Sequence, residues 1–174
     1  MSYSVKLLAA VMVIFGGGYA GVLLSSAFST RVRQLKQLSN GISQIGFNIS
    51  FLHMNVADSM RCASGLVKGT VNKIFLCVAE DISSNGMKPS VAFDRAMRRY
   101  SGDLCLTSAD REIIKEFADN LGIGDAESEM NNIKAAAAKL HLAETEAESE
   151  CGQKGRLWRG IGILGGVFAV ILLF

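Results

Sequence analysis

Proline and strand-like alternation are nearly absent from this sequence. Its 174 residues include a single proline, Pro89, and no segment alternates between polar and apolar residues as a half-buried strand does. The predicted fold class is therefore all-α, a compact bundle of about six helices. The chain also lacks a large net charge, because it contains 18 Lys and Arg residues and 16 Asp and Glu residues. We expect no nucleic-acid partner, since that would require a strong basic bias.

Catalytic motifs are missing as well. The two histidines, His53 and His141, are far apart in the sequence, and no HExxH, GxSxG or phosphate-binding loop motif lies in the charged part of the chain. The sequence therefore offers no nucleophile paired with a base. We expect a protein that is not an enzyme and that has no cofactor, no metal and no small-molecule substrate.

The cysteines form no closely spaced pair of the kind that binds zinc or exchanges disulfides. They are Cys62, Cys77, Cys105 and Cys151. Free cysteine is among the most buried residue types, so we predict buried, reduced thiols. The even number leaves disulfides in an oxidising compartment as the alternative.

Two long apolar runs lie at the ends of the chain. Residues 7–30 contain no charged side chain, and as a helix they would reach roughly 36 Å, enough to cross a hydrocarbon layer of about 30 Å. Residues 160–174 would reach only about 22 Å. We predict an N-terminal transmembrane helix over 1–30, a helical-bundle domain over 31–157, and a transmembrane or membrane-inserted helix over 158–174.

Positive charges flank both apolar runs on the side of the central domain. They are Arg31, Arg33, Lys36, Lys154, Arg156 and Arg159. The positive-inside rule then places the central domain in the cytoplasm and both termini across the cell membrane, with two spans. A cleaved signal peptide is the rival interpretation, with Ser26-Ala27-Phe28 as a weak cleavage site. The length of the first run and the cations that follow it favour a stop-transfer segment.

The central part has helical periodicity. After the first run, apolar residues recur at steps of three and four; they are Leu35, Leu38, Ile42, Ile45, Ile49, Leu52 and Val56. Gly41 and Gly46 each weaken this helix by roughly 1 kcal/mol, so it needs a partner helix. Shorter helices follow, and the longest one after the first begins at Asp125. We expect the first and last long helices to pair antiparallel.

Glycines four residues apart occur in both apolar runs, at Gly17 and Gly21 and at Gly162 and Gly166. Such pairs let membrane helices approach closely, so the two runs are predicted to pack together or against other membrane subunits. The alternative is the ordinary enrichment of glycine in membrane helices.

Two charged clusters are candidate partner-binding surfaces. The first contains Arg95, Arg98 and Arg99, together with Glu112 on the next helix, and the second contains Glu144 and Glu148 on one helical face. Charge complementarity could orient a partner on either surface. The alternative is that both are simply solvated faces.

Four elements of the chain form a recognisable layout: the N-terminal apolar run that continues into the Leu35–Leu52 helix, Gly86 ahead of Ser90-Val91-Ala92-Phe93, the turn Leu121-Gly122-Ile123-Gly124-Asp125, and the ending from Leu157-Trp158-Arg159-Gly160 to Val170-Ile171-Leu172-Leu173. In these elements the chain resembles the stage III sporulation protein AB family of endospore-forming bacteria over nearly the full length. The chain departs from the family pattern at Asn48, Phe51, Met54-Asn55-Val56 and Glu129.

The resemblance implies a role in the channel-like apparatus between mother cell and forespore. The family is similar to the cytoplasmic domain of inner-membrane platform proteins of type II secretion and type IV pilus systems. The implied partners are a stage III sporulation protein AA-like ATPase and the other membrane subunits of the channel. The competing hypothesis is a membrane-tethered signalling or sensor module, which the very short segments outside the membrane disfavour.

Overall fold

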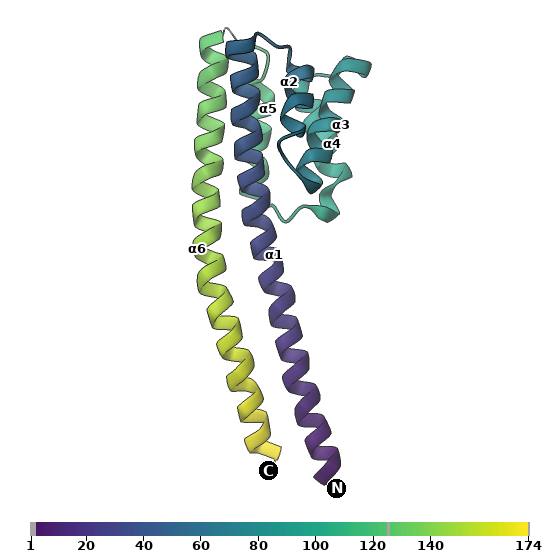
Figure 1. Cartoon of the computed structure of the whole chain (residues 1–174), viewed down its shortest axis with the longest axis vertical. Coiled ribbons are helices and arrows are strands. Elements are labelled where there is room, and N and C mark those ends of the chain that lie inside the picture. Colours follow the sequence, from purple (N-terminus) through teal and green to yellow (C-terminus); the bar gives the residue numbers. More distant parts are fainter. Residues whose placement is uncertain (1–2, 125, 174) are drawn as a thin grey trace. The chain divides into compact units, whose positions relative to one another are not determined.

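The fold is all-helical, as predicted, and no strand occurs in the described ranges. The computed structural model describes residues 3–124 and 126–173, with side chains for residues 27–124 and 127–152. Its elements are α1 (Tyr3–Leu52), α2 (Val56–Ser64), α3 (Gly69–Asn85), α4 (Pro89–Arg99), the 3₁₀ helix η1 (Ser101–Asp103), α5 (Ser108–Asn120) and α6 (Ala126–Leu173). Figure 1 labels the six α-helices.

The chain divides into two compact units. Residues 31–145 form one unit, and residues 1–30 with 146–174 form the other. The predicted membrane segments, apart from residues 27–30, and the four glycines at 17, 21, 162 and 166 lie outside the residues whose side chains are described. Among the described residues, no helix is both long and apolar enough to cross a membrane.

The core of the 31–145 unit is built on the apolar row of α1. Leu35, Leu38, Ile42 and Ile45 are all fully buried. Three buried phenylalanines, one each from α3, α4 and α5, continue the core as an edge-to-face series. Phe93 lies 6.4 Å from Phe75 and 6.0 Å from Phe117 between ring centroids, with interplanar angles of 80° and 83°. This geometry favours aromatic pairs beyond simple burial, and it ties three helices together.

Gly41 and Gly46 are where other elements touch the α1 backbone. The Phe75 ring of α3 occupies the space that a side chain at Gly41 would fill, and Ile133 of α6 does the same at Gly46. Each glycine therefore has a partner helix: α3 packs against α1 at Gly41, and α6 packs against it at Gly46. The weak helix propensity of glycine is offset by closer packing.

Within the 31–145 unit, α1 and α6 run antiparallel, as expected (Figure 1). Lys36 contacts Glu144, Ser39 contacts the Ala137 carbonyl, and Ser50 contacts Met130. In these contacts, higher residue numbers in α1 pair with lower residue numbers in α6, as antiparallel helices require.

Local signals define the helix ends. The Asn55 side chain accepts a hydrogen bond from the Asp58 amide and caps α2, and Pro89 occupies the first turn of α4. Gly86 ends α3 with φ of 60°, which is the left-handed conformation that glycine adopts without strain. Thr107 and Asp110 form a reciprocal capping box at the start of α5.

An ion pair and a glutamine hold the start of α1 in this unit against α5 and the loop before it. Arg31 donates to both carboxylate oxygens of Asp110, at 2.9 and 3.0 Å, and Asp110 is 1% exposed. Gln34 donates to the Asp103 carbonyl at 2.8 Å and accepts from the Cys105 amide at 2.9 Å. Burial by itself raises the pKa of Asp110, but the hydrogen bonds from Arg31 and Thr107 outweigh it and hold the pKa below its ordinary value of 3.8.

The cysteine prediction is partly corrected. All four thiols are free, but only Cys77 is buried, while Cys62 is exposed and Cys105 and Cys151 are half-buried. Cys62 lies on the exposed face of the short helix α2, away from the face that buries Ala57, Met60 and Ala63.

Replacing Gly41 by alanine is expected to lower the free energy of unfolding by about 1 kcal/mol, because overpacking against Phe75 outweighs the gain in helix propensity. Thermal unfolding of the full chain in detergent, followed by circular dichroism at the helix band, measures the effect. Gly152→Ala is the matched control, since a side chain there meets nothing within 4 Å. Equal stability of the two variants would contradict the packing role of Gly41.

Asp110→Asn is expected to destabilise the protein by about 2 kcal/mol at pH 7, because the charged hydrogen bonds to Arg31 are lost. The pKa of Asp110 is lowered in the folded state, so its contribution is complete above pH 3.8 and disappears as the pH falls through the lowered value. Denaturant unfolding between pH 7 and pH 2 should show the difference from wild type shrinking at the acidic end. A difference independent of pH would refute this assignment.

Candidate functional site between α4 and α5

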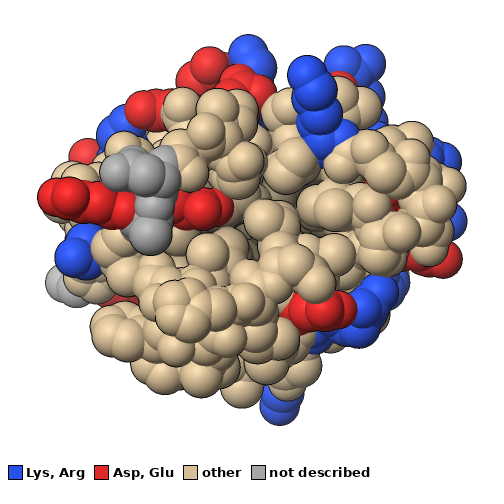
Figure 2. Space-filling model, turned by 90° about the horizontal axis from the view of Figure 1, so that it is seen from above, with Lys and Arg blue, Asp and Glu red and all other residues tan. Residues whose placement is uncertain are grey.

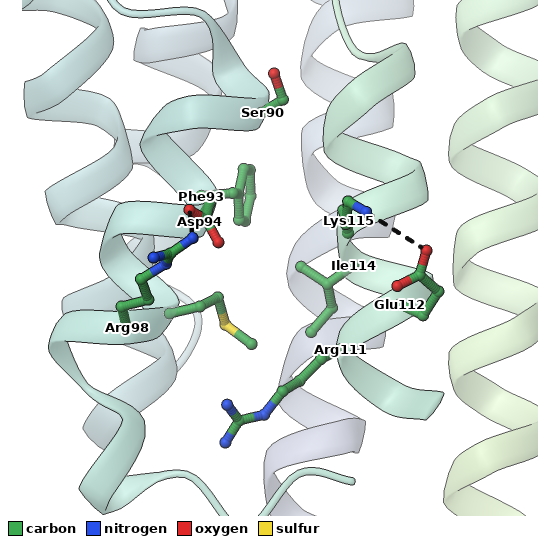
Figure 3. A pocket seen from close by; sticks show the side chains of 9 residues that line it. Ser90, Phe93, Asp94, Arg98, Arg111, Glu112, Ile114 and Lys115 are labelled. Atoms are coloured by element: carbon green, nitrogen blue, oxygen red, sulfur yellow. Dashed lines mark ion pairs between the residues drawn. The ribbon is translucent and has the colours of Figure 1, made fainter. Parts of the chain in front are cut away.

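The structure brings together two of the residues predicted to bind a partner. Arg98, near the end of α4, and Glu112, in the first turns of α5, line the same groove, which has a volume of about 150 Å³. Figure 3 shows the groove between the two helices. Its position follows from the helix starts, because Pro89 sets the beginning of α4 and the Thr107 capping box sets that of α5.

The floor of the groove is apolar. Phe93 and Met97 of α4 and Ile114 of α5 are 2%, 8% and 1% exposed, and all three line the groove. Phe93 also belongs to the core aromatic series. Phe93 therefore joins the floor of the groove to the core of the unit.

The rim of the groove is charged, and most of its charges are paired locally. Arg98 lies 2.8 Å from Asp94 one helical turn away, and Lys115 lies 3.8 Å from Glu112 (Figure 3). Arg111 is different, because its guanidinium has no hydrogen-bond acceptor or carboxylate partner among the described side chains. In Figure 3 it extends from α5 towards α4.

Sequence reasoning missed Arg111. It follows Asp110 in the capping box, and it precedes Ile114 and Lys115 by three and four residues, which places it on their face of α5. That spacing was available in the sequence. Its relation to Arg98 was not, since α4 supplies the opposite wall.

Arg95 and Arg99 do not line the groove. Arg95 lies 3.0 Å from Asp81 of α3, a carboxylate that is only 8% exposed and that also accepts from Asn85. Arg99 lies over the Tyr100 ring, 5.8 Å from its centroid. Arg95 thus neutralises a buried acid, and the predicted arginine cluster divides into residues with different contacts.

The second predicted surface is corrected at Glu144. This side chain is 9% exposed, and its carboxylate contacts Nζ of Lys36 at 3.8 Å and Nδ1 of His141 at 3.3 Å. The Glu144 carboxylate is thus already paired within the 31–145 unit, and it is not part of an exposed face. Glu148 is exposed, and it belongs to the other unit.

The end of the bundle where α1 ends and α6 begins contrasts with the groove. Figure 2 shows charged side chains mostly around the edge of this view and uncharged residues in its middle. Phe51 and Leu52 in the last turn of α1 and Ile123 in the α5–α6 turn are 67%, 56% and 79% exposed. This end therefore presents exposed apolar side chains.

The groove can bind a side chain of another molecule, since it combines buried apolar surface with oriented charges. Its lining contains no histidine or cysteine. In the part of the chain whose side chains are described, no three His, Cys, Asp or Glu residues are grouped so as to hold a metal ion.

The 31–145 unit is thus an all-helical domain in which α1 and α6 run antiparallel and α4 and α5 form a charged surface groove. The family model for stage III sporulation protein AB matches residues 6–174, so the chain belongs to that family. It is 23% identical over 168 residues to stage III sporulation protein AB of Bacillus subtilis (strain 168), and the aligned region covers 97% of this chain and 98% of that protein.

A solved structure of a stage III sporulation protein AB has the same fold. The TM-score is 0.65 at 22% sequence identity, and the match covers 70% of this chain and 96% of the other. The family resemblance inferred from the glycine turn and the chain ending is confirmed.

The different surroundings of Arg95 and Arg98 lead to different expected costs of substitution. Arg95→Gln removes the partner of nearly buried Asp81 and is expected to destabilise the fold by about 1 kcal/mol. Arg98→Gln breaks only an exposed pair and is expected to cost less than about 0.5 kcal/mol. Denaturant unfolding of the two variants checks this, and a larger cost for Arg98→Gln would contradict it.

Proposed function

We propose that this protein is a membrane-tethered platform subunit of the channel-like apparatus that joins mother cell and forespore during sporulation. Its helical domain would hold a secretion-type ATPase, similar to stage III sporulation protein AA, against the membrane. The observation that carries the proposal is the exposed α4–α5 groove, which combines an apolar floor with a charged rim. Membership of the family over residues 6–174 supplies the sporulation context.

The proposed tether consists of the apolar runs at the two ends of the chain. Under the positive-inside rule, the cations at 31, 33, 36, 154, 156 and 159 keep the domain in the mother-cell cytoplasm and both termini on the far side. The glycine pairs Gly17/Gly21 and Gly162/Gly166 would then pack the spans together or against the other membrane subunits of the channel.

The proposed role is mechanical. The ATPase would supply the hydrolysis. The series Phe75–Phe93–Phe117 links the groove to the core beside α1. A push on α4 or α5 would therefore reach α1, the helix that continues into the predicted first span.

Reversal of charge at the groove is expected to weaken capture of the ATPase. Arg98→Glu should reduce the affinity about tenfold, because it places a third carboxylate beside Asp94 and Glu112. Arg95 is a poorer choice for this test because its reversal would also leave buried Asp81 unpaired.

The measurement is co-purification and binding of the full-length protein, in detergent or nanodiscs, to the ATPase from the same organism. Lys73→Glu is the matched control, since Lys73 is exposed on α3 and does not line the groove. Helicity of both variants should equal that of wild type by circular dichroism. If the wild-type protein does not bind the ATPase, the proposed function is wrong. If Arg98→Glu and Lys73→Glu lose the same amount of affinity for the ATPase, the groove is not the binding surface.

A further inference from the structure

We propose that the α4–α5 groove recognises an apolar side chain accompanied by a carboxylate on the same partner segment. The apolar side chain would fill the groove over Phe93, Met97 and Ile114, and the carboxylate would pair with Arg111. The inference rests on the proposed function, because it describes the part of the ATPase that the groove would bind.

The apolar half of this recognition follows from the floor. Its three side chains are nearly buried in the free protein, yet they line a groove of about 150 Å³. That volume suits one side chain of the partner and no more than a short segment of its backbone. Because the floor is packed against the core, a partner side chain would enter a preformed site, and little ordering of this protein would oppose binding.

The charged half follows from how the rim charges are paired. The lining contains three cations, Arg98, Arg111 and Lys115, and two carboxylates, Asp94 and Glu112. Arg98 and Lys115 already contact the two carboxylates. Arg111 is a half-buried residue whose guanidinium lacks a partner in the described part of the chain. The rim therefore complements one negative charge.

A carboxylate fits this position better than a nucleic acid does. Arginine presents two parallel N–H donors that match the two oxygens of a carboxylate, and burial beside apolar side chains reduces screening by solvent. A nucleic-acid backbone would need several unpaired cations in a row, and here Arg98 and Lys115 are already paired with Asp94 and Glu112. The partner is thus an acidic protein segment with an apolar residue close to its Asp or Glu.

The first experiment measures the affinity of full-length protein for the purified ATPase at low and high salt. Arg111→Gln is expected to weaken binding about tenfold and to flatten its salt dependence, and Arg111→Lys is expected to weaken it about threefold, since it keeps the charge but not the paired donors. Lys73→Gln removes an equal charge from α3 and should change nothing. Wild-type affinity and salt dependence in Arg111→Gln would overturn the inference while the ATPase docking stands.

The second experiment identifies the bound segment without assuming the ATPase. A photo-crosslinking amino acid, p-benzoylphenylalanine, replaces Ser90 at the edge of the groove in sporulating cells, and Lys73 serves as the control position. Mass spectrometry should locate the adduct on a segment with Asp or Glu within four residues of a Leu, Ile, Met or Phe.

The position of the adduct separates the two proposals. An adduct on such a segment of the ATPase supports both. An adduct on such a segment of another protein supports the groove chemistry and overturns ATPase docking. An adduct on a segment without a carboxylate, or no adduct at Ser90 beyond that at Lys73, overturns the groove chemistry.

Discussion

The ion pair between Arg31 and Asp110 constrains the arrangement of the whole 31–145 unit. It joins the first residue of that unit to the first turn of α5, and Asp110 at the same time closes the capping box that starts α5. Gln34 adds one hydrogen bond to Asp103, the last residue of η1, and one to Cys105 in the loop before α5. Because α5 supplies one wall of the groove, the position of the groove relative to α1 depends on these contacts.

Packing against the α1 backbone positions the other wall. Gly41 admits the Phe75 ring, and that ring contacts Phe93, which belongs both to the core and to the floor of the groove. The same glycine that weakens α1 as an isolated helix is what lets α3, and through it α4, approach closely. Low helix propensity and close packing are two consequences of one missing side chain.

The groove joins the structure to the proposed role. On the rim, Asp94 pairs with Arg98 and Glu112 pairs with Lys115. These pairs cancel each other's charge, so they do not repel a partner of either sign. Arg111 then supplies the excess charge, and the apolar floor supplies contact area. A surface of this kind can hold another protein while leaving the chemistry to that protein, which is what a platform subunit in a sporulation channel would require.

The sequence by itself determined the helix starts and ends, since Asn55, Pro89, Thr107 and Gly86 act through neighbours in the chain. It also determined the family, through the glycine turn and the apolar ending. Only the tertiary structure decided which charges are available: Arg95 is bound to Asp81 on another helix, Glu144 is buried against Lys36, and Arg111 is left without a partner in the described region. The physical reason is that a cap is a local interaction, whereas the burial and pairing of a charge depend on residues far away in the sequence.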